Sequence, residues 1–242
     1  MFPGDERLEP VWAELNRRRA VAFVHPNAIA SPQLGLPAPL SDGAFETARS
    51  VVDMLYAGVF RRYPDLTVIL AHAGGALPAM SGRLEQRGAE PWVPNAQNIT
   101  RDEIREHLAR LYLDTGNAGA DASLAPALAM VPRDHLIYGS DSGARCNTDE
   151  TSATNIRALR DSRVLVDGEA DQLGHRGWDL FPTSQPPRRQ KLNRLSSRQP
   201  PAASRQPPET GSGPAAQHDL LAFTRSRARS GGRSGRTIRR SG

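Results

Sequence analysis

The chain has 242 residues, of which 38% are hydrophobic and 20 are proline, a composition that suits one α/β domain with part of the chain outside its core. A single cysteine, Cys146, excludes an intramolecular disulfide and a metal site made only of thiolates. The net charge of +5 is divided unevenly: residues from Pro182 onward hold thirteen Lys or Arg and two acids, which leaves −6 for the first 181 residues.

Apolar runs and amphipathic segments alternate along the chain. A polar opening segment leads into a helix within residues 1–20, and four apolar runs predict strands near residues 20–24, 66–71, 111–114 and 135–139. Helical spacing of apolar residues predicts helices over 43–62, 101–111 and 120–131, and Pro78 suits the first turn of another helix. This alternation predicts right-handed βαβ units and a parallel sheet, and therefore an α/β fold.

Each predicted strand ends at or beside a residue that can bind a metal or move a proton: His25, His72, Asp114 and Asp141. Because the C-terminal ends of parallel strands meet at one rim, we expect these side chains to converge. Such residues also occur as strand caps or turn residues, and for Asp114 we expect structural hydrogen bonding rather than catalysis. We expect His107 and His135 at the surface, on a helix and before a strand.

The C-terminal part of the chain has a different composition. Residues 183–242 are rich in Arg, Pro, Ser and Gly, which predicts a disordered basic tail after a domain of residues 1–182. The tail lacks interleaved aromatic residues and any recognised module, so we do not expect nucleic-acid binding. Without a signal peptide or an apolar run of about 18 residues, the sequence predicts a cytoplasmic protein with no membrane contact.

Four segments together resemble one protein family. They are "DERLEPVWAELNRRRAVAFVHP", "RRYPDLTVILAHAGGALPAMSGRLEQ", "LYLDTG" and "DHLIYGSD". In this combination the sequence is similar to the amidohydrolase-related (amidohydrolase family 2) proteins over roughly residues 4–182. Within that family it most resembles the branch of metal-dependent decarboxylases that includes aminocarboxymuconate-semialdehyde and 6-methylsalicylate decarboxylases.

The resemblance implies a (β/α)8 TIM barrel of which this sequence contains the C-terminal half. The four predicted strands correspond to the fifth through eighth strands of that barrel. Family members carry an H-x-H pair of metal ligands on the first strand, and no such pair occurs among the six histidines of this chain. We therefore expect the N-terminal half of the barrel to be missing here.

The resemblance also implies roles for individual residues. His25 matches a metal ligand, and Asp141 matches a carboxylate that contacts the metal and can take part in catalysis. His72 matches a catalytic histidine beside the metal-bound water. Arg83 matches an arginine that reaches the active site of a neighbouring subunit to bind a substrate carboxylate, which implies a homodimer.

These residues predict a metal-dependent decarboxylase, a carboxy-lyase acting on a small aromatic or unsaturated carboxylic acid, with zinc as the expected divalent metal. A metal-dependent hydrolase on the same scaffold is the first alternative, because the rim residues do not distinguish C–C from C–O or C–N cleavage. A non-catalytic truncated fragment is the second. With His25 and Asp141 as two of four protein ligands, we expect this chain alone to bind no metal stably and to be inactive, since catalytic zinc sites have at least three protein ligands.

Overall fold

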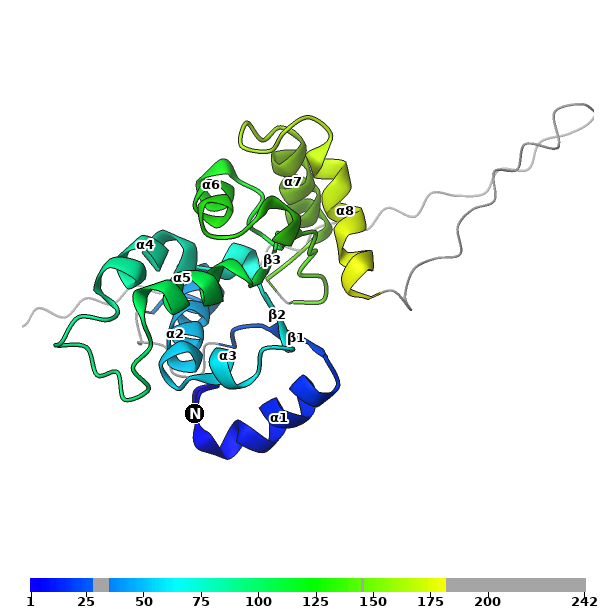
Figure 1. Cartoon of the computed structure of the whole chain (residues 1–242). Coiled ribbons are helices and arrows are strands. Elements are labelled where there is room, and N and C mark those ends of the chain that lie inside the picture. The colour runs from blue at the N-terminus through cyan, green and yellow to red at the C-terminus, as the bar shows by residue number, and fades with distance from the viewer. Residues whose placement is uncertain (28–34, 145, 182–242) are drawn as a thin grey trace, which may run out of the picture. The chain divides into compact units, whose positions relative to one another are not determined.

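The central feature of the fold is a four-stranded sheet (Figure 1). A computed structural model describes residues 1–27, 35–144 and 146–181. The strands lie side by side in the order β1 (Val21–Val24), β2 (Thr67–Leu70), β3 (Tyr112–Asp114) and β4 (Leu136–Ile137). All three neighbouring pairs are parallel, which confirms the predicted α/β architecture. The predicted tail over 183–242 and its boundary lie outside the described residues.

Helices occupy the segments between and after the strands. The α-helices are α1 (Glu9–Arg17), α2 (Asp42–Tyr56), α3 (Val59–Arg62), α4 (Leu77–Arg87), α5 (Arg101–Ala109), α6 (Asp121–Met130), α7 (Asp149–Arg160) and α8 (Glu169–Leu180). Short 3-10 turns are η1 (Glu6–Leu8), η2 (Ala38–Leu40), η3 (His72–Gly74) and η4 (Arg133–His135). Pro78 stands in the first turn of α4, as predicted. Every helix in the described part of the chain is too short or too polar to cross a bilayer.

The predicted single helix over 43–62 is wrong, because the chain divides it into α2 and α3 at Gly58. Gly58 has a φ of +74°, and its N–H donates to the carbonyl of Leu55. A left-handed glycine just after the last helical turn is a common way for a helix to end. A Cβ at this position would also lie 2.9 Å from a guanidinium nitrogen of Arg62.

The last strand is shorter than predicted. The sequence predicts a strand over 135–139, whereas β4 contains only Leu136 and Ile137. The next backbone N–H, that of Tyr138, donates to the carbonyl of Leu173 in α8 at 3.1 Å. The chain therefore leaves the sheet at Tyr138 because α8 supplies the hydrogen-bond partner.

The two faces of the sheet have different surroundings. The buried core on one face contains the strand residues Val68, Leu70, Leu113 and Leu136 and the helix residues Val51, Leu55, Leu77, Ile104, Leu108 and Leu124. The other face borders a pocket, which is lined by the strand residues Phe23, Ile69 and Ile137. Because side chains alternate across a strand, helices cover one face of the sheet and the pocket borders the other.

Two histidines expected at the surface are partly or fully buried. His107 is 9% exposed, and its ring centroid lies 5.9 Å from that of Phe60. It follows the buried Ile104 at helical spacing, so it falls on the apolar face of α5. His135 is half-buried and stacks on Tyr112, with ring centroids 4.1 Å apart.

Candidate metal and substrate site

The candidate site lies at the C-terminal ends of the strands. The sheet register pairs Val24 with Leu70 and Asp114 with Ile137, so the strands end at a common edge. The segments that follow β1, β2 and β4 bring His25, His72 and Asp141 together, and one potential ligand atom from each lies within 4.8 Å of the others. The predicted convergence of these three side chains is therefore present in the structure.

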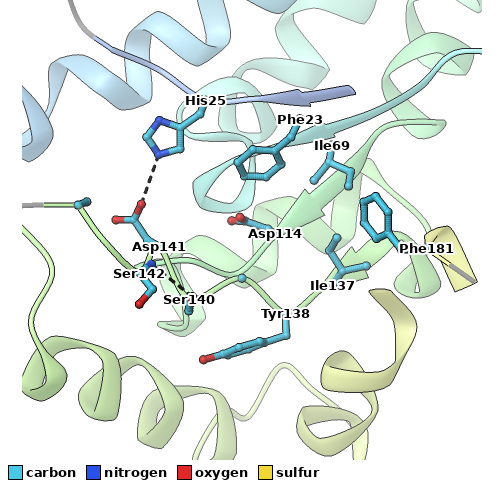
Figure 2. A pocket seen from close by; sticks show the side chains of 12 residues that line it. Phe23, His25, Ile69, Asp114, Ile137, Tyr138, Ser140, Asp141, Ser142 and Phe181 are labelled. Carbon is cyan, nitrogen blue, oxygen red and sulfur yellow. Dashed lines mark hydrogen bonds and ion pairs between the residues drawn. The ribbon is translucent and has the colours of Figure 1, made fainter. Parts of the chain in front are cut away.

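The contacts of His25 determine which ring nitrogen carries its proton. Nδ1 lies 2.8 Å from the backbone carbonyl of Pro26, and a carbonyl oxygen only accepts, so Nδ1 is the donor. Nε2 then presents its lone pair to Oδ1 of Asp141 at 3.3 Å. A cation between these two acceptor atoms, either a proton on Nε2 or a metal ion, would favour their approach. Figure 2 shows the two side chains joined by a dashed line.

His72 is held by a tight turn. The φ angles of His72 and Ala73 are +58° and +53°, which is uncommon for residues with a Cβ and typical of strained functional loops. A Cβ on Gly75 would lie 2.5 Å from the carbonyl oxygen of Ala44, so only glycine fits there. Nδ1 of His72 donates to the carbonyl of Gly116 at 2.8 Å, which leaves Nε2 free to bind a metal or exchange a proton.

Asp114 stabilises this turn through hydrogen bonds to its backbone. Its side chain is buried at 6% exposure, and Oδ1 accepts the backbone N–H of His72 at 2.8 Å and of Gly116 at 3.0 Å. Burial raises the pKa of the Asp114 carboxyl above its ordinary value, and these two hydrogen bonds act in the opposite direction. The contacts agree with the structural hydrogen bonding expected for Asp114.

Two asparagines hold Asp141, and sequence reasoning missed both. Nδ2 of Asn117 donates to Oδ2 of Asp141 at 2.6 Å, and Nδ2 of Asn147 donates to its backbone carbonyl at 3.0 Å. Asp141 itself has a φ of +52°. The position of Asn117 directly after the "DTG" segment was the available signal, because loops after parallel strands carry functional groups.

Beside this cluster lies a pocket of about 630 Å³. Its lining is formed by Phe23, His25, Ile69, Asp114, Ile137, Tyr138, Gly139, Ser140, Asp141, Ser142, Ala144 and Phe181. Figure 2 shows Ile69, Ile137 and Phe181 together on one side, while His25 and Asp141 lie on the other. An apolar wall opposite a small set of polar groups is typical of a site for a small organic molecule.

Arg83 does not join this cluster. It lies on the exposed face of α4 and is absent from the lining of the pocket. The role implied for it, binding a substrate in a neighbouring subunit, stays a prediction.

The rim residues fit a divalent metal ion. Zinc binds nitrogen and oxygen ligands at about 2.0–2.1 Å, so neighbouring ligands in a tetrahedral site lie about 3.3 Å apart. Nε2 of His25 and Oδ1 of Asp141 have that separation. The pocket lining contains two carboxylates and, within the described residues, no Lys or Arg. A bound anion would therefore find its positive partner in a metal ion or in a protonated histidine of the rim. His72 places a third potential donor atom within 4.8 Å of these two.

Two curated relatives are similar to this chain. The 6-methylsalicylic acid decarboxylase of Penicillium expansum is 33% identical over 143 residues, covering 58% of this chain and 44% of the relative. The 6-methylsalicylic acid decarboxylase of Aspergillus aculeatus is 36% identical over 146 residues, with the same two coverages. The chain thus spans less than half the length of these relatives.

Solved structures have the same fold. A 2,6-dihydroxybenzoate decarboxylase complexed with 2,6-dihydroxybenzoate superposes with a TM-score of 0.62 at 20% identity, covering 76% of this chain and 58% of that one. A dihydroxybenzoic acid decarboxylase from Polaromonas sp. with bound manganese and the inhibitor 2-nitroresorcinol has a TM-score of 0.62 at 19% identity, with coverages of 77% and 57%. The four described strands thus correspond to part of an amidohydrolase TIM barrel, as predicted. The Amidohydrolase family model matches residues 2–202, and the chain belongs to this family.

Proposed function

We propose that the rim of this chain forms the catalytic side of a metal-dependent decarboxylase for aromatic or unsaturated carboxylic acids. The observation that carries the proposal is the approach of His25, His72 and Asp141 to within 4.8 Å beside a largely apolar pocket. The curated relatives support decarboxylation over hydrolysis, because both act as 6-methylsalicylic acid decarboxylases by name.

In this proposal His25 and Asp141 hold a divalent cation. Zinc suits nitrogen and oxygen donors, and the manganese in one structural neighbour indicates that other divalent ions suit the scaffold. When bound, the cation supplies a Lewis acid that anchors the oxygens of the substrate and offsets negative charge. The carbonyls of Pro26 and Gly116 contribute by fixing both imidazoles with Nδ1 protonated.

His72 is the proton donor in the proposed reaction. The bond between the carboxyl carbon and the carbon that bears it breaks, and carbon dioxide leaves. The electron pair of that bond stays on the carbon that bore the carboxyl group. Nε2–H of protonated His72 delivers a proton to this carbon, and the histidine returns to its neutral form. Asp114 aids the step by holding the backbone N–H of His72, which fixes the direction of the ring. Asp141 is the second candidate for the proton transfer.

The apolar wall sets the class of substrate. Phe23 and Phe181 are 52% and 42% exposed, and both line the pocket, where flat side chains suit a planar ring. A small aromatic acid can place its ring against this wall and its oxygens toward His25 and Asp141.

The proposed activity belongs to a closed barrel, whereas the described sheet has four strands. The test is a chimera that joins this chain to the part of the Penicillium expansum relative that it does not match. We expect the chimera to bind zinc and to release carbon dioxide from 6-methylsalicylic acid. His72→Ala should remove most turnover and leave the metal bound. A folded, zinc-loaded chimera with no activity on a panel of aromatic acids would contradict the proposal.

A further inference from the structure

We propose that Asn117 is a positioning residue that determines which oxygen of Asp141 faces the cation. This inference rests on the proposed function. Asn117 Nδ2 donates to Oδ2 of Asp141 at 2.6 Å, while Oδ1 faces Nε2 of His25 at 3.3 Å. The two oxygens of one carboxylate thus have separate partners, one an amide and the other the ligand cluster.

The direction of this hydrogen bond is fixed by chemistry. An ionised carboxylate only accepts, so the amide nitrogen of Asn117, and not its oxygen, must face Asp141. A hydrogen bond to an ionised acceptor is roughly twice as strong as a neutral one. Because Oδ2 accepts this hydrogen bond, Asp141 presents only Oδ1 to a cation and is a monodentate ligand.

Asn117 and its neighbours connect both sides of the site. The carbonyl of Gly116 accepts Nδ1–H of His72, and the adjacent side chain of Asn117 holds Asp141. The same loop is fixed from α7, where Asn155 donates to the carbonyl of Thr115 at 2.8 Å. One short loop therefore orients a histidine and a carboxylate that belong to different strand ends.

A simpler explanation is that Asn117 only stabilises its own turn. Its φ is +51°, in the left-handed region, which asparagine tolerates better than most residues. Asn98 provides a matched control, because it has the same φ of +51° and lies in the segment before α5, outside the pocket lining. Glycine adopts this backbone freely, so Asn117→Gly and Asn98→Gly each remove the side chain without adding strain.

The first measurement uses the metal-free chain and the NMR signals of the asparagine side-chain amides. Replacing Asp141 by alanine should shift the Nδ2 resonances of Asn117 and leave those of Asn98 unchanged. Unshifted Asn117 resonances would overturn the proposal, because the hydrogen bond would then be absent in solution.

The second measurement is titration of the chain with Co2+ followed by visible absorption. Partners of ligand side chains typically contribute about 10–100-fold in metal affinity, so Asn117→Gly should weaken Co2+ binding by that factor and alter the absorption bands. Asn98→Gly should change neither. Equal affinity and spectra for Asn117→Gly and the unmodified chain would overturn the positioning role. If the unmodified chain binds no Co2+, that agrees with the expectation that this chain alone holds no metal stably, and the amide resonances then decide the role of Asn117.

Discussion

Gly139 gives the sharpest test of how the fold holds the site. It lies two residues after the end of β4, and a Cβ added there would lie 2.5 Å from Cγ and 2.8 Å from Cβ of Asp114, and closer still to Oδ2. Asp114 is buried and tied to the N–H groups of His72 and Gly116, so it has little room to withdraw. We therefore expect Gly139→Ala to displace the carboxylate that supports the turn of His72.

The expected size follows from forcing a methyl group against the buried side chain of Asp114. Inserting a methyl group into such a position typically lowers the free energy of unfolding by about 1–3 kcal/mol. Gly82→Ala is the matched control, since Gly82 lies in α4 and a Cβ there would meet no atom within 4 Å. That substitution should raise the free energy of unfolding by about 0.5–1 kcal/mol, because alanine favours the helix.

Urea unfolding followed by circular dichroism measures both changes. If the contact with Asp114 is the cause, Gly139→Ala should cost less in an Asp114→Ala background, with a coupling of about 0.5–3 kcal/mol. Equal effects of Gly139→Ala and Gly82→Ala on the free energy of unfolding, or an unchanged cost in the Asp114→Ala background, would show that the contact with Asp114 is not the cause.

Three further predictions concern other parts of the chain. Burial lowers the pKa of His107 below 6.5, so its contribution to the free energy of unfolding is fully present above pH 6.5 and falls as the pH drops toward the pKa of the folded state. In unfolding measured from pH 7 to pH 5, His107→Leu should reduce this loss of stability. Arg83→Ala should raise the KM of the chimera for a carboxylic acid only where the chimera is a dimer, and an unchanged KM in a dimer would contradict the implied role. Trypsin under native conditions should cut first after residue 182, and resistance of the Arg-rich segment would argue against a disordered tail.

The sequence predicted the parts of the fold that depend on local pattern. Apolar runs located the four described strands, because strands of a parallel sheet are nearly continuous in hydrophobic residues. The end of β4 could not be predicted, since it depends on the carbonyl of Leu173, distant in sequence. The burial of His107 could have been predicted from its spacing to Ile104 and Leu108 on α5. Its polar side chain argued against a buried position.

The residue types of the candidate site could be predicted from the sequence, whereas the hydrogen bonds that hold its side chains in place could not. His25, His72 and Asp141 were identified because each follows an apolar run. Asn117 contacts Asp141 across 24 positions of sequence, and neither periodicity nor composition carries that information.

In the proposed site, the strand ends hold a divalent cation through His25 and Asp141. Metal content of the purified chimera, compared with its His25→Ala and His72→Ala variants, tests it most directly. We expect near-stoichiometric zinc in the parent and in His72→Ala, and loss of the metal in His25→Ala. The His107→Ala variant removes a histidine of α5 that lies outside the cluster, so it should keep its zinc. It shows whether loss of any imidazole lowers the metal content. Full zinc content in a folded His25→Ala variant would contradict the assignment of the site.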